Sequence, residues 1–169
     1  MIRFDFLNKN EFLGFSHDLF DILADNMSLI CPTGNDREED FKEWYQAVSE
    51  GLKKDKRRII LIFDDTVPKL VGFFQYYTTV DTLVMEEIQF RSEYQRRYNI
   101  FRQLYGYVLQ NVGSDIRYVE AYANSCNHKS IGILGKLGLE LINELRGGKL
   151  YHFKGDFSSL VDWYNNPKI

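Results

Sequence analysis

The spacing of apolar residues divides the N-terminal part of the chain into one strand and two helices. Residues 2–7 alternate apolar and polar side chains, which predicts a short strand. Residues 12–23 carry apolar side chains three and four apart, as on one face of a helix, and Asn8 or Asn10 can cap this helix. After a turn that contains Pro and Gly, the same spacing predicts a second helix over 36–54 with an acidic first turn.

The middle of the chain has the pattern of three consecutive strands. A continuous apolar run at 59–63 is typical of a strand covered on both faces, and residues 70–79 and 82–91 follow after short turns. Glu86 and Glu87 lie in the third of these strands. Because side chains alternate along a strand, these two carboxylates point to opposite faces.

The C-terminal part alternates helices with strands and closes on a hairpin. Amphipathic spacing predicts a helix over 98–112, a strand over 117–123 and a shorter helix over 130–137. Two further strands, 139–145 and 149–154, flank a Gly-Gly turn and form the hairpin. The expected order is therefore strand, two helices, three strands, helix, strand, helix and hairpin.

Composition narrows the class of protein. The 169 residues are 44% hydrophobic and 27% charged, and we expect a single domain over 1–169. A net charge of −3 gives no sign of a nucleic-acid partner, and two distant cysteines with three histidines give no sign of a metal site. No apolar run approaches the roughly 18 residues of a membrane helix, and the first residues lack a signal-peptide pattern. We therefore expect a cytoplasmic protein without a membrane partner.

A basic turn precedes the 98–112 helix. Residues 91–102 contain four Arg and one Glu. A helix N-terminus presents unpaired amides and a partial positive charge, so it can hold an anion, and Arg96 and Arg97 would suit a pyrophosphate. The alternative is a surface loop whose arginines contact acidic side chains.

A second segment joins a strand to the short helix of 130–137. Asn127 lies where the strand ends and the helix begins, and Ser130 follows three residues later. Capping of the helix by Asn127 is the simpler interpretation of this spacing.

Taken together in this order, the two segments resemble the GNAT superfamily of N-acetyltransferases. The acyl-CoA motif of that family is Arg/Gln-x-x-Gly-x-Gly/Ala between a strand and a helix, and the match here is Arg96-Arg97-Tyr98-Asn99-Ile100-Phe101. The downstream family segment, Asn-x-x-Ala-x-x-x-Tyr-x-x-x-Gly-Phe, matches the run from Asn127 to Leu139 at identical spacing. The order of predicted elements along the whole chain is also similar to that of the family.

The resemblance implies a mixed α/β (α+β) fold, with a mostly antiparallel sheet flanked by helices, and acetyl-CoA as acyl donor. In the family the fourth strand separates from the fifth, and the pantetheine and thioester lie in the gap. By resemblance, acyl-CoA is contacted by backbone of the fourth strand, by amides of the basic turn, and near the pantetheine arm by the Asn127 segment. The implied cofactor-binding residues are Ile88, Gln89, Phe90, Arg96, Arg97, Tyr98, Asn99, Ile100, Phe101, Asn127 and Ser130.

Three positions depart from the family pattern. Asn99 and Phe101 replace the two glycines of the turn, and Asn tolerates left-handed backbone angles better than most residues do. Leu134 stands where the family often has a Tyr that acts as general acid. Tyr122 or water would then have to protonate the departing thiolate.

Acid–base and acceptor residues are expected near the fourth strand. Glu86 and Glu87 are candidate general bases, with Glu87 preferred because Glu86 shares a face with Ile88 and Phe90; the alternative is an ordinary paired carboxylate. Candidates for contact with the acceptor are Tyr76, Tyr77 and Trp44, which core packing would explain equally simply.

Three functions remain open at this point. The first is an acyl-CoA-dependent N-acetyltransferase that transfers an acetyl group to a primary amine by direct attack. The second is an acyl-CoA-binding sensor or interaction module of the same fold with little or no catalysis, and the third is an interaction protein that has lost the cofactor. A homodimer is compatible with all three.

Overall fold

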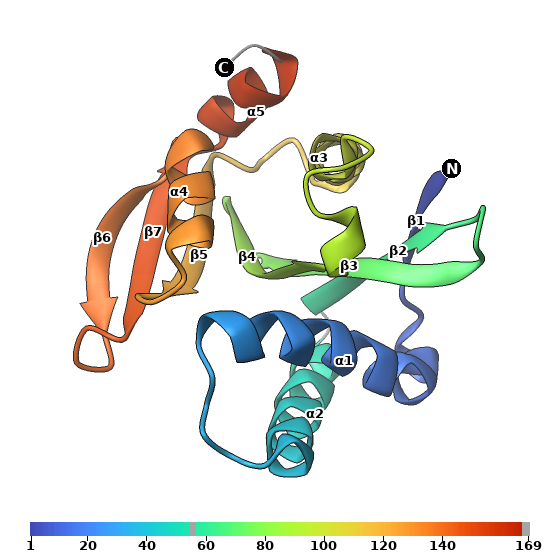
Figure 1. Cartoon of the computed structure of the whole chain (residues 1–169). Coiled ribbons are helices and arrows are strands. Elements are labelled where there is room, and N and C mark those ends of the chain that lie inside the picture. The colour runs from blue at the N-terminus through green and yellow to red at the C-terminus, as the bar shows by residue number, and fades with distance from the viewer. Residues whose placement is uncertain (55–56, 167–169) are drawn as a thin grey trace. The chain divides into compact units, whose positions relative to one another are not determined.

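The computed structural model of the chain describes residues 1–54 and 57–166. The strands are β1 (Ile2–Phe6), β2 (Arg57–Asp64), β3 (Lys69–Thr78), β4 (Thr82–Phe90), β5 (Tyr118–Asn124), β6 (Glu140–Leu145) and β7 (Leu150–Asp156). The helices are α1 (Phe12–Ile30), α2 (Arg37–Lys53), α3 (Ile100–Asn111), α4 (His128–Lys136) and α5 (Phe157–Asn165), with 3-10 turns η1 (Lys9–Glu11) and η2 (Ser92–Tyr94). The predicted order of elements is confirmed up to the closing hairpin, and α5 follows that hairpin (Figure 1).

The strands form a mixed, mostly antiparallel sheet, as the resemblance implies. Hydrogen-bonded neighbours follow the order β1-β2-β3-β4-β5-β7-β6. The β4–β5 pair is parallel, whereas β1–β2, β5–β7 and β6–β7 are antiparallel. The chain divides into two compact units, residues 1–76 with 87–100 and residues 77–86 with 101–169, which are described in turn. A single-domain organisation stays a prediction.

In the first unit, α1 and α2 pack together and bury one face of the β-strands. Phe12, Leu19 and Ile22 of α1 join Val48 and Leu52 of α2 in one hydrophobic cluster. The cluster also contains β2 and β3 side chains, namely Ile59, Leu61, Leu70 and Phe73. The helical spacing that predicts these two helices is therefore the spacing of their buried faces.

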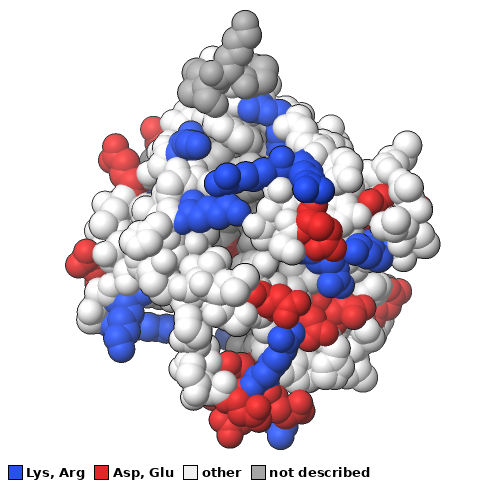
Figure 2. Space-filling view, in the orientation of Figure 1, with Lys and Arg blue, Asp and Glu red and all other residues white. Residues whose placement is uncertain are grey.

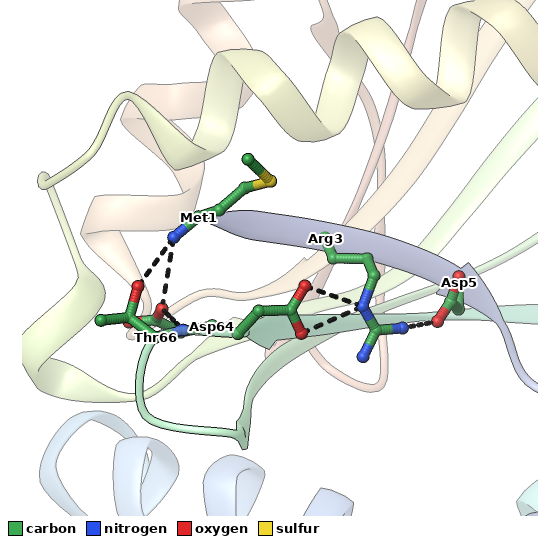
Figure 3. A network of polar contacts seen from close by, with 6 residues as sticks. Met1, Arg3, Asp5, Asp64 and Thr66 are labelled. Atoms are coloured by element: carbon green, nitrogen blue, oxygen red, sulfur yellow. Dashed lines mark hydrogen bonds and ion pairs between the residues drawn. The ribbon is translucent and has the colours of Figure 1, made fainter.

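Polar contacts join β1 to the turn after β2 in the first unit (Figure 3). The Arg3 Nε donates to both carboxylate oxygens of Asp65 at 3.0 Å, and Arg3 also contacts Asp5. The amino group of Met1 donates to Thr66 Oγ1 at 2.9 Å and lies 3.6 Å from Asp64 Oδ1. These contacts supplement the backbone hydrogen bonds between β1 and β2. They hold the end of β2, where Asp64 lies, in place.

In the second unit, α4 and α5 pack against strands β5 and β7. Val119 and Ala121 of β5, Phe153 of β7 and Leu160 of α5 are all buried. Residues 118, 120, 122 and 124 alternate with these inward positions and lie on the other face of β5. One face of this part of the sheet is thus covered by helices, and the opposite face carries polar and aromatic side chains.

Helix α3 begins two residues later than the apolar spacing predicts. Tyr98 and Asn99 have left-handed backbone angles, with φ of 59° and 52°, so they cannot form the first turn of a right-handed helix. The sequence pattern includes Tyr98 in the helix because its side chain has the right spacing, whereas the backbone angles decide where the helix begins.

Two further observations concern the environment of the chain. In the part that the structure describes, no helix is both long enough and apolar enough to cross a membrane. Among the residues that the structure describes, no cysteine is a free thiol.

Candidate functional site

The turn that precedes α3 has an unusual backbone. Arg96, Tyr98 and Asn99 all have left-handed angles, with φ of 61°, 59° and 52°. Left-handed residues among right-handed ones direct successive amide groups toward one point, which makes a concave anion site. This segment, residues 96–99, is called the phosphate turn below, and its left-handed Asn99 fits the expectation that Asn can replace the family glycine.

The two arginines of the phosphate turn are available to a ligand. Arg96 and Arg97 are exposed, and neither forms an ion pair with any residue that the structure describes. Figure 2 shows several blue Lys and Arg side chains in the upper half of the face in view. Arg102 differs, because it donates to the carbonyls of Trp163 and Tyr164 and lies 4.7 Å from the centre of the Trp163 ring. The simple surface-loop alternative is therefore weakened for the first two arginines.

Phe101 is used for packing in the second unit. Its ring lies 4.9 Å from the Tyr105 ring and 5.7 Å from the Trp163 ring, measured between centroids. The ring thus joins α3 to α5, which gives this bulky residue a structural role at the position of the second family glycine.

A buried hydrogen bond anchors the residue that leads into the phosphate turn. Tyr94 of η2 donates from its hydroxyl to Asp64 Oδ2 at 2.5 Å. This bond holds the pKa of Asp64 below its usual range, and raises the pKa of Tyr94 to about 12. The Tyr94 ring also lies 5.5 Å from the ring of Tyr98 and beneath the Lys69 ammonium, which is paired with Glu93. The phosphate turn therefore starts from a fixed point on β2.

Side-chain amides fix the end of β4 in the first unit. Asn26 of α1 donates from Nδ2 to the Phe90 carbonyl at 2.8 Å and to Gln89 Oε1 at 2.9 Å. Gln95 Nε2 donates to the same Phe90 carbonyl and to Asn26 Oδ1, each at 3.2 Å. Both lone pairs of the Phe90 carbonyl are thus engaged within the unit.

Gly72 of β3 makes room for this arrangement. A Cβ at position 72 would lie 2.6 Å from the Gln89 carbonyl oxygen and 2.7 Å from the Phe90 ring. The Gln89 carbonyl therefore faces β3. Of the three β4 residues that the resemblance assigns to the pantetheine arm, Ile88 is the one whose backbone is not engaged by these contacts.

The candidate base Glu87 belongs to the same network. Gln89 Nε2 donates to Glu87 Oε1 at 2.6 Å, so the chain of contacts runs from Gln95 through Asn26 and Gln89 to Glu87. Glu86 and Glu87 are both half-buried. Neighbouring positions on a strand separate their side chains, as predicted, and the structure assigns Glu86 to the second unit and Glu87 to the first.

In the second unit, the parallel β4–β5 register runs from Thr82–Tyr118 to Met85–Ala121. Both strands continue beyond that point, β4 to Phe90 and β5 to Asn124. Tyr122 is the first residue of β5 after the paired segment. Partial burial, then the nearby Glu120 and Tyr77, raises the pKa of Tyr122, so its phenol stays protonated near neutral pH and can donate a proton.

A Glu–His contact lies beside Tyr122, and nothing in the sequence pattern predicts it. His152 Nε2 lies 3.0 Å from Glu120 Oε1, and the His152 ring stacks on the Tyr122 ring at 4.4 Å with an interplanar angle of 9°. The contact depends on the register that places Tyr122 opposite His152. Side-chain alternation gives Glu120 and Tyr122 one face, but a single sequence gives no register with β7.

Several other candidate residues have structural duties. Tyr76 is 2% exposed and stacks on Phe74, which favours the packing interpretation over contact with an acceptor. Trp44 packs against the first-unit core, and Tyr77 is half-buried in the second unit. Asn127 accepts a hydrogen bond from the Ser130 amide at 3.2 Å and so caps α4. Among the described residues, no three His, Cys, Asp or Glu side chains are grouped as metal ligands would be.

Solved structures with the same fold include several acetyltransferases. No model of a known protein family matches the chain, and no curated protein matches it in sequence. An acetyltransferase from Thermus thermophilus aligns at 16% identity and a TM-score of 0.69 over 93% of this chain and 97% of its own. The PaiA N-acetyltransferase of Thermoplasma acidophilum, solved with coenzyme A, aligns at 12% identity and 0.70 over 93% and 99%.

A third similar structure is the spermidine N-acetyltransferase of Vibrio cholerae with CoA and spermine. It aligns at 14% identity and a TM-score of 0.62 over 98% of both chains. Other neighbours are described as GNAT proteins, which supports the resemblance. At these identities the comparisons establish the fold, and the chain has the fold of GNAT acetyltransferases.

Proposed function

We propose that the protein transfers an acetyl group from acetyl-CoA to a primary amine. The observation that carries this proposal is the phosphate turn. Three non-glycine residues in the left-handed region cost on the order of 1–2 kcal/mol each, and such strain clusters at ligand sites. A pyrophosphate would accept hydrogen bonds from these amides and from Arg96 and Arg97.

We assign the pantetheine arm to the edge of β4 that faces away from β3. The carbonyls of Gln89 and Phe90 are engaged by β3 and by side-chain amides, so Ile88 is the best candidate for backbone pairing with the arm. Of the three β4 residues that the resemblance implies as contacts of the arm, this leaves Ile88. Asn127, as a helix cap, would approach the arm through its backbone rather than through its side chain.

The proposed reaction is direct attack within one complex. The amine nitrogen forms a bond to the thioester carbonyl carbon, the carbon–sulfur bond breaks, and the surplus proton of the amine passes to a base. The CoA thiolate then takes up a proton, for which the protonated Tyr122 phenol is a candidate donor. Bringing amine and thioester together supplies a large part of the rate.

One observation favours a second function. Leu134, at the position of the family tyrosine, is 7% exposed and provides no acid from α4. A protein that binds acyl-CoA but hardly turns it over would tolerate this residue, so the acyl-CoA sensor or interaction module remains the alternative.

Binding and turnover are tested separately. A ligand at 100 times its Kd stabilises the protein by about 2.7 kcal/mol, so acetyl-CoA should raise the Tm by roughly 5–11 °C. Release of CoA thiol is then followed with a panel of primary amines. A Tm shift without thiol release supports the binding module, and no shift with acetyl-CoA or CoA contradicts both functions.

A further inference from the structure

The Glu120–His152 contact departs from ordinary pairing between neighbouring strands. Lys154 stands directly opposite Glu120 in the β5–β7 register. Oppositely charged residues at such positions stabilise a sheet when they pair. Here the Lys154 ammonium lies over the Tyr118 ring, 4.7 Å from its centre, and Glu120 contacts the diagonal neighbour His152 at 3.0 Å. Glu120 therefore pairs with the imidazole of His152 and not with the ammonium group of Lys154.

This arrangement leaves one imidazole nitrogen for chemistry. Nε2 faces Glu120, and no residue that the structure describes forms a hydrogen bond with Nδ1. A carboxylate on one nitrogen orients the ring and stabilises the imidazolium that forms when the other nitrogen takes a proton. Tyr122 stacks on the ring and limits its rotation.

The position of the pair fits a role in transfer. Tyr122, opposite His152, follows directly on Ala121, where the β4–β5 pairing ends. The side chains lie on the face of β5 and β7 opposite to the buried Ala121 and Phe153, so α4 and α5 do not cover them. Glu120 and His152 retain 23% and 16% side-chain exposure, enough for contact with a small substrate.

We infer that His152, oriented by Glu120, is the base that accepts the proton of the acceptor amine. The inference rests on the proposed acetyl transfer and assigns the role to His152 rather than to Glu87. The amine proton passes to Nδ1 as the nitrogen–carbon bond forms, while the Nε2–H donates to Glu120. The acceptor arrives as a primary ammonium group, which the adjacent carboxylate and tyrosine rings attract. It loses one proton to solvent to become the neutral amine that attacks, and its next proton passes to Nδ1.

The first test is independent of the acceptor. The ring C–H signals of His152 and His17 are followed by NMR while acetyl-CoA is added to the full chain. We expect the His152 signal to move and the signal of His17, an exposed residue of α1, to stay. Binding of acetyl-CoA without movement of the His152 signal overturns the inference alone, whereas absence of binding overturns the proposed function as well.

The second test compares H152Q with E120Q, E87Q and the control H17Q, with 1,4-diaminobutane, 2-phenylethylamine, lysine amide and glucosamine as probes. We expect H152Q to lower kcat by about 10²- to 10⁴-fold, because this is the usual contribution of a general base, and to leave acetyl-CoA binding unchanged. Wild-type kcat should fall as the pH is lowered, because a protonated imidazole cannot accept a proton, and H152Q should lose this acid limb.

The effect of His152 on the pH dependence of kcat must be distinguished from the effects of titratable groups near it. The titratable groups on the same face are Glu140 of β6, Lys154 of β7 and Tyr118, Glu120 and Tyr122 of β5. Tyr77 of β3 also lies near Tyr122. An acid limb that persists in H152Q but disappears in E87Q assigns the base to Glu87 and overturns the inference. Acetyl-CoA binding without acetylation of any probe rejects the base together with amine transfer.

Discussion

The Tyr94 hydroxyl donates to the Asp64 carboxylate across 2.5 Å, and both side chains are buried, at 6% and 8% exposure. Tyr94 lies two residues before the phosphate turn, and Asp64 is the last residue of β2. The bond therefore links a strand of the first unit to the segment that we assign to the pyrophosphate.

Replacing Tyr94 with Phe should loosen the phosphate turn. The change removes one charge-assisted hydrogen bond and leaves the buried Asp64 carboxylate without it, so we expect Tm to fall by about 2–6 °C. CoA affinity should fall too, whereas affinity for pantetheine, which lacks the phosphates, should not. Calorimetric titration of both ligands, with Y151F as control, checks this; equal losses for the two ligands would argue against a role in holding the turn.

The same bond predicts how stability depends on pH. The pKa of Tyr94 is raised to about 12, so its contribution is present below pH 10, the ordinary tyrosine value, and is lost as pH rises from 10 toward 12. The pKa of Asp64 is lowered, so its contribution is present above pH 4 and is lost as pH falls below that value. Urea unfolding at pH 7 and pH 11 should show a smaller alkaline loss in Y94F than in wild type. Equal losses in the two proteins would contradict the assignment.

Removing the two exposed arginines should weaken the binding of CoA more than removing two other positive charges does. We expect the R96A/R97A variant to bind CoA roughly 10- to 100-fold less tightly, which corresponds to about 1.4–2.8 kcal/mol for the two side chains together, because both are exposed and solvent screens their charges. The double variant K42A/K149A removes the same charge from exposed positions elsewhere and controls for net charge. A similar loss of CoA affinity in the control would show that the effect comes from long-range electrostatic attraction and not from direct contact.

The left-handed angle of Asn99 predicts a ranking of substitutions. N99G should keep both Tm and CoA affinity, because Gly adopts φ of 52° without strain. N99V should lower the free energy of unfolding by about 1–2 kcal/mol, because a β-branched residue is strained there. Thermal unfolding of both variants measures the difference, and equal stability of N99V and N99G would contradict the described turn.

Gly72 should not tolerate a side chain. G72A places a methyl group 2.6 Å from the Gln89 carbonyl, so we expect a loss of about 1–3 kcal/mol and a disturbed β4 edge. G14A, in α1 with no atom within 4 Å of the added Cβ, should be neutral or stabilising by up to about 1 kcal/mol. Chemical denaturation of the two variants gives the comparison, and a neutral G72A would refute the close approach.

Features that depend on residues close in the sequence are predicted, whereas features that depend on residues far apart in the sequence are not. The order of elements is predicted because periodicity and caps are local. For Asn99 the sequence predicts only that it can replace a family glycine, and its φ of 52° agrees with that expectation. The burial of Tyr76 requires knowing which face of β3 is covered. The Glu120–His152 contact requires the β5–β7 register, and the Tyr94–Asp64 bond joins residues 30 positions apart. Such contacts arise from tertiary structure, for which one sequence has no local signal.

The left-handed residues of the phosphate turn are held in shape by folding itself, before any anion arrives. If the turn binds the pyrophosphate as we propose, it loses little entropy on binding, and residues such as Asp64 that hold the turn in place contribute to affinity without touching the ligand. Selection for tighter or weaker cofactor binding could therefore act on β2, and a mutational screen restricted to ligand-lining positions would overlook such changes.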